Sequence, residues 1–487
     1  MRATNLRRAV KGKMNIRKWK SPIALFLSLT LFLGTAYSAS ADTPEQVKEV
    51  RELLLKYHYG SPSEQSLNVN DIDQMIATLD DPYTQFFDEN EWKAFNSVLE
   101  KTFVGIGIVM REDKGAVYVD EVLEGSPAEA VGIAAGDMLT ATGSKSLKGK
   151  STAEIQQLLL GEEGSKVSLT VTREGKKLSF IIVRKQIQLS AVKTTMLGDG
   201  VGYLGLSGFT SDAAAEVKKQ LAELEKQGMK SLVFDLRDNG GGYVDTAQKI
   251  AGLFLESGVL AYIRDRDNND EALSVSGSRK PYPLVVLVNG NSASASELLA
   301  GALQDYGVAD LVGTQTYGKG VMQSIVTLRS GGVLKLTIRQ YLTPSEQKVD
   351  KVGLTPNLVV QDPVSQLVEA YRMMGGHKVT VTAKNDIVTM EGIRMAEPSA
   401  ALQDSKGNWY VNIRMGASIA GAKLEYDADK REFRLAKGKK TRTLPSNDSH
   451  LTVKNGRTLI ELDYLTKWYP GLSYSVKDDT LKLSSKG

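Results

Sequence analysis

The sequence lacks cysteine entirely and contains only three histidines among its 487 residues. Without cysteine the chain can form no disulfide, no thiolate nucleophile and no cysteine-ligated metal site. The histidines, His58, His377 and His450, are too few and too scattered along the sequence to predict a metal cluster, so we expect neither a metal nor a cofactor. A hydroxyl nucleophile would therefore need a base other than histidine, and a neutral lysine is the common substitute.

Negative charge is missing from residues 1–41, which carry eight Lys and Arg side chains and no Asp or Glu. Basic residues precede an apolar run at 23–33, and small residues follow up to 39–41. This is the order of a secretory signal peptide. An uncleaved membrane anchor is the alternative, because no charged residue occurs over 21–41. In either case we expect an extracytoplasmic protein, secreted or associated with the membrane or cell wall.

A strong basic excess is also absent once this leader is set aside. The formal charge of the whole chain is +4, and removing the eight leader charges leaves −4, which gives no argument for nucleic-acid binding. The composition, with 41% apolar and 24% charged residues, is that of a folded protein. The length suits two to four domains of ~100–200 residues each. No segment after the leader is apolar enough to cross a membrane.

The hydrophobic periodicity changes along the chain and predicts a multidomain α/β protein. Residues 43–59 have the pattern of a capped amphipathic helix, and 70–100 that of two further short helices. Short strands, glycine-rich turns and one helix occupy about 102–186. Over 200–360 apolar strands alternate with helices, which indicates a parallel sheet covered on both faces.

The last hundred residues contain an internal repeat. Segment 408–438 resembles 457–487, with corresponding pairs such as Val411 and Ile460. Each unit has the pattern of a strand or helix followed by a hairpin that turns on Asp. Two units are too few for a solenoid, so we predict one small pseudo-symmetric α+β domain.

A serine-rich turn is the first candidate for chemistry. Ser294 lies in the run 289–297, which connects a predicted buried strand to a helix. At the N-terminus of that helix, free N–H groups and the helix dipole would favour developing negative charge. The ordinary alternative is a helix cap, because Ser294 and Glu297 have the spacing of a capping box.

Lys319 is the second candidate, with glycine on both sides and a strand before it. The segment 313–319 nearly matches a phosphate-binding loop, which would indicate a nucleotide hydrolase. That motif requires Ser or Thr after the lysine and then a helix. Here Gly320 follows, and 321–328 alternates like a strand. We therefore reject the phosphate-binding interpretation.

A third turn, at 240–242, consists of three glycines between a strand and a helix. Glycines let the backbone approach a ligand and direct N–H groups at an anion, although an ordinary strand-to-helix turn has the same composition. All three turns follow strands of the same predicted sheet. Ligands of open α/β sheets bind at the carboxyl ends of the strands, so their joint occurrence favours a site there.

In this order, four motifs resemble those of the carboxyl-terminal processing proteases, also called tail-specific proteases. The motifs are DLRDNGGG (235–242), VNGNSASASELLAGALQDYG (288–307), TYGKGVMQ (316–323) and VGLTPNLVV (352–360). The resemblance covers roughly residues 45–365 and includes LDDPYTQFF at 79–87. It implies that Ser294 is the nucleophile, that Lys319 is the base and that Gln323 completes the triad. It also implies a secreted serine endopeptidase that cuts proteins near their C-termini.

The chemistry of these roles makes further demands. Lys319 must lose its proton, so its pKa must fall from ~10.4 by several units, which burial can supply. We therefore expect an apolar environment without a carboxylate partner, and a neutral Gln323 that orients the amine. The oxyanion hole would consist of the backbone N–H groups of Ala295 and, by family position, of Gly241. Asp305 also matches an acidic family position, but its place near the helix end favours a structural role.

Residues 103–108 resemble the carboxylate-binding loop of a PDZ domain. The backbone of Gly105, Ile106, Gly107 and Ile108 would bind a terminal carboxylate while the next strand pairs with the peptide. The resemblance implies that this domain recognises free C-terminal tails of protein or peptide substrates and gates the active site. It also makes dimerisation through the N-terminal helices plausible.

The C-terminal repeat weakly resembles the small domain at the N-terminus of copper amine oxidases, without implying copper binding.

These segments leave one alternative function and predict five regions along the chain. The alternative function is a catalytically idle PDZ peptide-binding scaffold of the cell envelope. The predicted domains are a signal peptide (1–41), an N-terminal helical segment (42–100), a PDZ domain (101–186), a Ser/Lys protease core (187–365) and the accessory domain (380–487).

Overall fold

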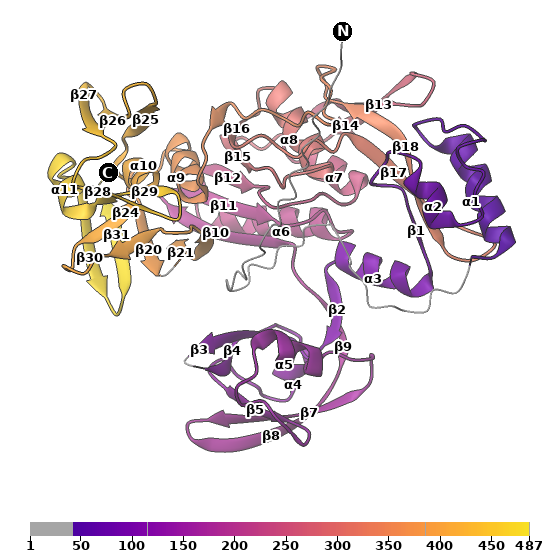
Figure 1. The fold of residues 1–487 in the computed structure, drawn as a ribbon, viewed down its shortest axis with the longest axis horizontal. Coiled ribbons are helices and arrows are strands. Elements are labelled where there is room, and N and C mark those ends of the chain that lie inside the picture. The colour runs from indigo at the N-terminus through magenta and orange to yellow at the C-terminus, as the bar shows by residue number, and fades with distance from the viewer. Residues whose placement is uncertain (1–41, 114, 385, 487) are drawn as a thin grey trace, which may run out of the picture. The chain divides into compact units, whose positions relative to one another are not determined.

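The computed structural model describes residues 42–113, 115–384 and 386–486 (Figure 1). The predicted signal peptide lies outside these ranges. Within them, no helix is both long enough and apolar enough to cross a membrane.

The predicted N-terminal helices are α1 (Pro44–Tyr57), α2 (Ile72–Ala77) and α3 (Glu89–Leu99). Thr43 caps α1 in a reciprocal capping box with Gln46, as the sequence predicts. Between α2 and α3, the short strand β1 (Gln85–Phe87) pairs antiparallel with β18 (Val333–Leu342). This pairing attaches the N-terminal segment to a strand about 250 residues later in the chain.

The predicted PDZ segment is a β-rich module with its own apolar core. Its main sheet has the order β3-β4-β5-β7-β8, so β3 (Ile108–Asp113) is an edge strand. The ribbon β2–β9 joins both ends of the module to the rest of the chain. The other elements are β2 (Thr102–Gly105), β4 (Ala116–Val122), α4 (Pro127–Ala130), β5 (Met138–Thr142), β6 (Lys145–Ser146), α5 (Thr152–Leu159), β7 (Lys166–Arg173), β8 (Lys176–Val183) and β9 (Lys185–Gln188).

The central sheet is the predicted parallel one, with strand order β10-β11-β12-β15-β16-β19. Only the edge strand β10 runs antiparallel to its neighbour. In β12, Leu232 and Phe234 pack on one face and Val233 on the other, so the sheet is covered on both faces. The strands are β10 (Val192–Gly198), β11 (Val201–Leu206), β12 (Ser231–Asp235), β15 (Leu284–Val288), β16 (Ala309–Gly313) and β19 (Leu358–Val359), and the covering helices are α6 (Ala213–Lys226), α7 (Val244–Ala251), α8 (Ala295–Asp305) and, on the opposite face, α9 (Pro363–Met373).

A second sheet carries the segment that follows Lys319. In it β18 pairs with β1, with β13 (Ser257–Arg264) and with β17 (Val321–Thr327), and β13 pairs with β14 (Asp270–Ser276). Residues 321–327 therefore form a strand. A phosphate-binding loop requires a helix at this point, so the structure agrees with the rejection of a nucleotide site.

The C-terminal repeat is confirmed as two strand–helix–hairpin units. The first consists of β24 (Trp409–Asn412), α10 (Ile413–Ala420), β25 (Lys423–Asp427) and β26 (Glu432–Lys437), and the second of β29 (Arg457–Glu461), α11 (Leu462–Trp468), β30 (Leu472–Lys477) and β31 (Thr480–Ser485). β24 and β29 pair antiparallel, and Val411 lies opposite Ile460. The remaining strands are β20 (Thr380–Lys384), β21 (Ile387–Met390), β22 (Ile393–Ala396), β23 (Ala401–Gln403), β27 (Lys440–Pro445) and β28 (Leu451–Lys454).

The apolar core of this repeat is continuous with α9. Buried side chains of both units form one cluster with α9 and with the adjoining face of the central sheet. The described chain is thus a multidomain α/β protein: N-terminal helices, a β-rich module, a sheet covered by helices, and a small α+β domain.

Candidate active site

Ser294 occupies a strained position in the turn between β15 and α8. It directly precedes α8, with φ of 56° and ψ of −115°. Non-glycine residues rarely adopt a positive φ, and such strain concentrates at functional sites. The turn presents Ser294 at the start of a helix whose first N–H groups are not used within the helix.

The glycine turn after β12 is bound directly to the serine turn. The carbonyl of Asn239 accepts hydrogen bonds from the Ala293 N–H (3.0 Å) and from the Ser296 hydroxyl (2.8 Å). The buried Ser292 hydroxyl donates to the carbonyl of Leu236 (2.8 Å). Two of the three turns singled out in the sequence therefore form one unit.

Glu297 ties the third turn to this unit. Its side chain is fully buried, and its Oε2 accepts the backbone N–H groups of both Ser294 (2.9 Å) and Lys319 (2.9 Å). Its Oε1 accepts the Gly318 N–H (2.7 Å) and the Thr316 hydroxyl (2.6 Å). Burial raises the pKa of Glu297, and these four hydrogen bonds oppose the rise. The capping-box glutamate thus does more than cap a helix, because it links the candidate nucleophile to the candidate base.

A second side chain makes the same link on the carbonyl side. The hydroxyl of the buried Tyr341 lies 3.1 Å from the carbonyl oxygen of Ser294 and 3.0 Å from that of Lys319. Ser294 and Lys319 are therefore held together through both their N–H and their carbonyl groups. The two residues are 25 positions apart in the sequence but neighbours in the fold.

The Lys319 side chain is partly buried and points over an aromatic ring. Its Nζ lies 4.9 Å from the ring centroid of Tyr83, and none of the ion pairs within the described ranges includes it. Burial, reinforced by the positive charge of Lys335, lowers the pKa of Lys319 to about 8, although Asp81 and Glu297 act in the opposite direction. A base with this pKa is partly unprotonated at neutral pH.

Gln323 lies on β17 with its amide group oriented by a neighbouring strand. Its Nε2 donates to the hydroxyl of Thr337 (3.3 Å), which directs the amide nitrogen toward β18. Its Oε1 accepts no hydrogen bond from a described residue. A carbonyl oxygen in this state is suited to accept an N–H from an amine.

Gly241 packs directly against the candidate nucleophile. It has φ of 103°, and a Cβ at this position would lie 2.9 Å from the Ser294 Cβ and 3.0 Å from the Ala295 nitrogen. Its N–H is not free, however, because it donates to the side-chain oxygen of Asn239 (2.9 Å). The sequence pattern does not reveal this bond, which must break or be shared if Gly241 is to bind an oxyanion. The Ala295 N–H makes no hydrogen bond within the described ranges.

The N-terminal segment also contributes to the site, which the sequence pattern does not indicate. Tyr83 contacts Lys319, and the preceding Asp81 accepts hydrogen bonds from the buried His58 (3.0 Å) and from Thr84 (2.5 Å). Burial alone would raise the pKa of Asp81, but these hydrogen bonds keep it below its ordinary value. Both residues belong to the motif at 79–87, so the signal was present in the sequence without an indication of its role.

Asp305 has no contact with this site. Its carboxylate accepts hydrogen bonds from the backbone N–H (2.8 Å) and hydroxyl (2.7 Å) of Ser345. It therefore connects the end of α8 to the loop after β18, which agrees with the structural role favoured from the sequence.

The four predicted PDZ-loop residues lie together at the start of the edge strand. Gly105 ends β2, Ile106 is buried in the module's core, and Ile108 begins β3. Gly107 has φ of 84°, and a Cβ there would lie 2.2 Å from the Ser126 Cβ, so a side chain does not fit. The exposed edge of β3 is available to pair with an added strand.

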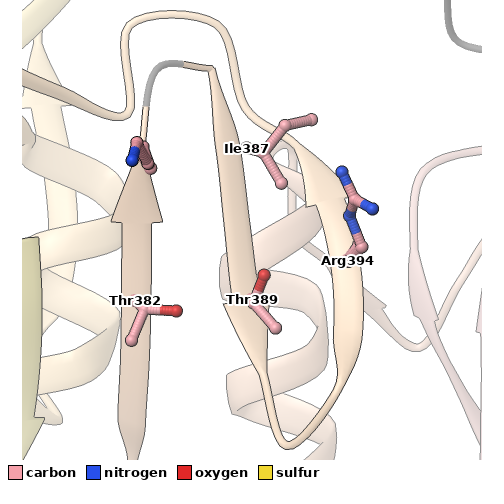
Figure 2. Close-up of a pocket in the computed structure, with 5 residues that line it drawn as sticks. Thr382, Ile387, Thr389 and Arg394 are labelled. Atoms are coloured by element: carbon pink, nitrogen blue, oxygen red, sulfur yellow. The ribbon is translucent and has the colours of Figure 1, made fainter. Parts of the chain in front are cut away.

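A surface depression away from this site offers no comparable chemistry. A shallow depression in the C-terminal domain is lined by Thr382, Lys384, Ile387, Thr389 and Arg394, whose side chains come from three adjacent strands (Figure 2). Lys384 is exposed to solvent, so this lining offers no desolvated amine that could act as a base. Across the part of the chain that the structure describes, no group of three or more His, Asp or Glu side chains is placed to hold a metal ion.

Two protein families match parts of this chain. The profile of Peptidase family S41 matches residues 200–360, and that of the PDZ domain matches residues 118–173. A probable CtpA-like serine protease of Staphylococcus saprophyticus is 32% identical over 350 residues, which cover 71% of each chain. Another from Staphylococcus aureus is 33% identical over 325 residues, covering 66% of this chain and 65% of its own.

Among solved structures, a photosystem II D1 C-terminal processing protease is similar at 28% identity and a TM-score of 0.45, covering 69% of this chain and 98% of that one. The S41 match contains Ser294, Lys319 and the glycine turn, and the relative from S. saprophyticus extends the likeness over most of both chains. The chain therefore belongs to peptidase family S41 and is a CtpA-like serine protease.

Proposed function

We propose that Ser294 is the nucleophile, Lys319 the general base and Gln323 the residue that orients the lysine. The observation that carries this proposal is the double link between the first two residues. Glu297 binds both backbone N–H groups, and Tyr341 lies within hydrogen-bonding distance of both carbonyl oxygens. Buried groups thus hold the backbones of the serine and the lysine side by side, which supports a nucleophile–base pair whose side chains come within hydrogen-bonding reach of each other.

In the proposed reaction, the neutral Lys319 amine takes the proton of the Ser294 hydroxyl as its oxygen attacks the scissile carbonyl carbon. The resulting ammonium returns the proton to the leaving amine as the carbon–nitrogen bond breaks. Water then attacks the acyl-enzyme. The neutral Lys319 amine takes the proton of this water and returns a proton to the Ser294 oxygen as the ester bond breaks. Gln323 would accept an N–H of the lysine without stabilising its charged form as a carboxylate would.

The oxyanion would be bound by the N–H groups of Ala295 and Gly241. The position of Gly241 against Ser294 supports this assignment, and each such donor typically contributes ~3–4 kcal/mol to transition-state stabilisation. We infer that the hydrogen bond between Gly241 and Asn239 competes with the oxyanion. Substrate binding would then have to redirect the Gly241 N–H toward the oxyanion, or let it donate to both acceptors, before the oxyanion hole is complete.

The PDZ module would select substrates by their free C-terminal tails. The edge strand β3, the glycine at position 107 and the adjacent helix α5 support a groove in which a peptide adds a strand and places its carboxylate at the loop. The resemblance to the tail-specific proteases further implies that the module gates the active site. Secretion through the leader at 1–41, and dimerisation through the N-terminal helices, remain parts of the proposal.

A reporter protein with an apolar C-terminal tail tests this function against the idle-scaffold alternative. We expect the full chain to shorten the reporter, with the new C-terminus identified by intact mass. The same reporter with a charged tail is the control for selectivity. Binding of the tail without any shortening at any pH between 6 and 10 would favour the scaffold.

The rate of cleavage should rise with pH. Lys319 acts only when unprotonated, and its pKa is about 8. Below pH 8, kcat/KM should therefore increase about tenfold per pH unit and then level off above it. Initial rates measured between pH 6 and 10 check this, and a profile that is flat or falls with pH would remove Lys319 from the role of base.

Amidation of the substrate's C-terminus should weaken recognition. A terminal carboxylate makes charge-assisted hydrogen bonds of about 1.5–3 kcal/mol, so its loss should raise KM by roughly ten- to a hundredfold while kcat changes little. Paired peptides that differ only in a free or amidated terminus measure the effect. Equal KM values for the two would contradict recognition of the carboxylate.

A further inference from the structure

Lys335 is a second buried lysine beside the proposed active site. It lies on β18 with only 6% of its surface exposed. Its ammonium group is 4.7 Å from the ring centroid of Phe95 and 5.8 Å from that of Phe87. No ion pair found within the described ranges includes it. A buried cation without a paired carboxylate destabilises the fold, so its presence calls for a function.

The strand register places Lys335 on the same face as the proposed catalytic groups. Lys335 lies opposite Ile325 on β17, and Thr337, two residues later, lies opposite Gln323. Residues two apart on a strand share a face, so Lys335 projects on the side where the Gln323 amide donates to Thr337. On its other edge Lys335 pairs with Gln85, two residues after the Tyr83 ring that contacts Lys319.

We propose that Lys335 is a positioning residue whose fixed positive charge keeps the neighbouring Lys319 side chain in its neutral, proton-accepting form. The proposal rests on the assignment of Lys319 as the base. Two ammonium groups close together in a poorly solvated site repel each other. The one whose charged form is less stabilised by its surroundings therefore loses its proton first.

Aromatic contacts stabilise the charged form more at Lys335 than at Lys319. The Lys335 ammonium lies over two neighbouring aromatic rings, which stabilise its charged form. Asp81 favours the charged form of both lysines and so does not distinguish them. Lys319 has a single aromatic contact, with Tyr83. The charged groups that act on it are Lys335, Asp81 and Glu297, and the hydrogen bonds of the Glu297 carboxylate are directed to backbone N–H groups and to Thr316.

The pKa shifts agree with this geometry. Burial lowers the pKa of both lysines, and the charge of Lys335 is the next largest cause of the lowering at Lys319. Asp81 opposes the lowering at both residues. Because the Lys335 ammonium lies over two aromatic rings and that of Lys319 over one, we expect Lys335 to be charged when Lys319 titrates.

The first test compares Lys335→Met, which keeps the length but removes the charge, with Lys335→Arg, which keeps the charge. In Lys335→Met the inflection of kcat/KM against pH should move upward by about one unit. Activity at pH 7 should then fall about tenfold and return to near the wild-type value at pH 10. Lys335→Arg should retain the wild-type inflection. A loss in Lys335→Met that is the same at every pH would indicate a purely structural role and overturn the proposal.

The second test measures protonation of Lys319 without using catalysis. In a Ser294→Ala background, acetic anhydride modifies the Lys319 amine only when it is neutral, and mass spectrometry of the peptide gives the midpoint of reactivity against pH. The midpoint should rise by about one unit when Lys335→Met is added. An unmoved midpoint overturns the proposal. A midpoint that moves while the kcat/KM inflection stays in place supports the coupling of the two lysines and instead refutes Lys319 as the base.

Discussion

Replacing Ser294 with alanine, or Lys319 with methionine, is expected to reduce cleavage of a tailed reporter by roughly 10⁴-fold or more. Each change removes one of the two groups that the proposed reaction requires, so the double variant should be no less active than either single one. Reporter shortening followed by mass spectrometry over several days gives the range needed. The circular dichroism spectrum and melting temperature of Ser294→Ala should match those of the wild type.

Two matched substitutions control for the loss of a serine hydroxyl and of a lysine charge elsewhere in the protein. Ser276→Ala on β14 and Lys348→Met in the loop after β18 change exposed residues of the same types, and both should leave activity unchanged. If Ser294→Ala still shortened the reporter at the wild-type rate, the nucleophile would be a different residue. If only Lys319→Met were active, the serine would be retained and the base would have to be sought elsewhere.

Replacing Glu297 with glutamine is expected to lower both activity and stability by more than loss of a helix cap would. The carboxylate accepts four hydrogen bonds, and the amide nitrogen of glutamine would face N–H donors where an oxygen now accepts them. Unsatisfied buried donors cost about 1–3 kcal/mol each, so the free energy of unfolding should fall by roughly 2–5 kcal/mol. Because the same oxygen binds Ser294 and Lys319, kcat should fall by roughly 10²–10³-fold as the two separate.

Urea unfolding gives the stability change, and kcat under folding conditions gives the activity change. Glu256→Gln, an exposed glutamate, is the matched control and should alter neither. A helix cap alone contributes about 0.5–2 kcal/mol and has no direct effect on catalysis. A stability loss within that range with kcat retained would return Glu297 to the role of an ordinary capping residue.

Much of the fold was predictable because it depends on local patterns. Alternating strands and helices indicated a covered parallel sheet, and the observed order from β11 to β19 is of that kind. The C-terminal repeat was also visible in the sequence, where Val411 corresponds to Ile460 and lies opposite it in the structure. Periodicity of 2 or 3.6 residues is a local property, so it can be recognised without knowing what the element packs against.

The candidate site was only partly accessible in the same way. Ser294, Lys319 and the glycine turn were found because each follows a strand of one sheet, and parallel strands end at a common edge. The spacing between Ser294 and Glu297 predicts only an ordinary helix cap. The bond of Glu297 to the Lys319 N–H depends on how the loop after β16 folds back on α8, which no spacing reveals.

Residues and motifs in the amino-acid sequence established the family, the order of structural types and the identity of the candidate nucleophile and base. Only the tertiary structure shows the groups that surround the candidate base and the candidate oxyanion donor. Tyr83 lies beneath the Lys319 amine, Lys335 lies on the strand that pairs with β17, and the Asn239 side chain accepts a hydrogen bond from the Gly241 N–H. Burial and charge determine the proton affinity of an amine, and both arise from segments far apart along the chain that meet only when strands such as β1 and β18 pair.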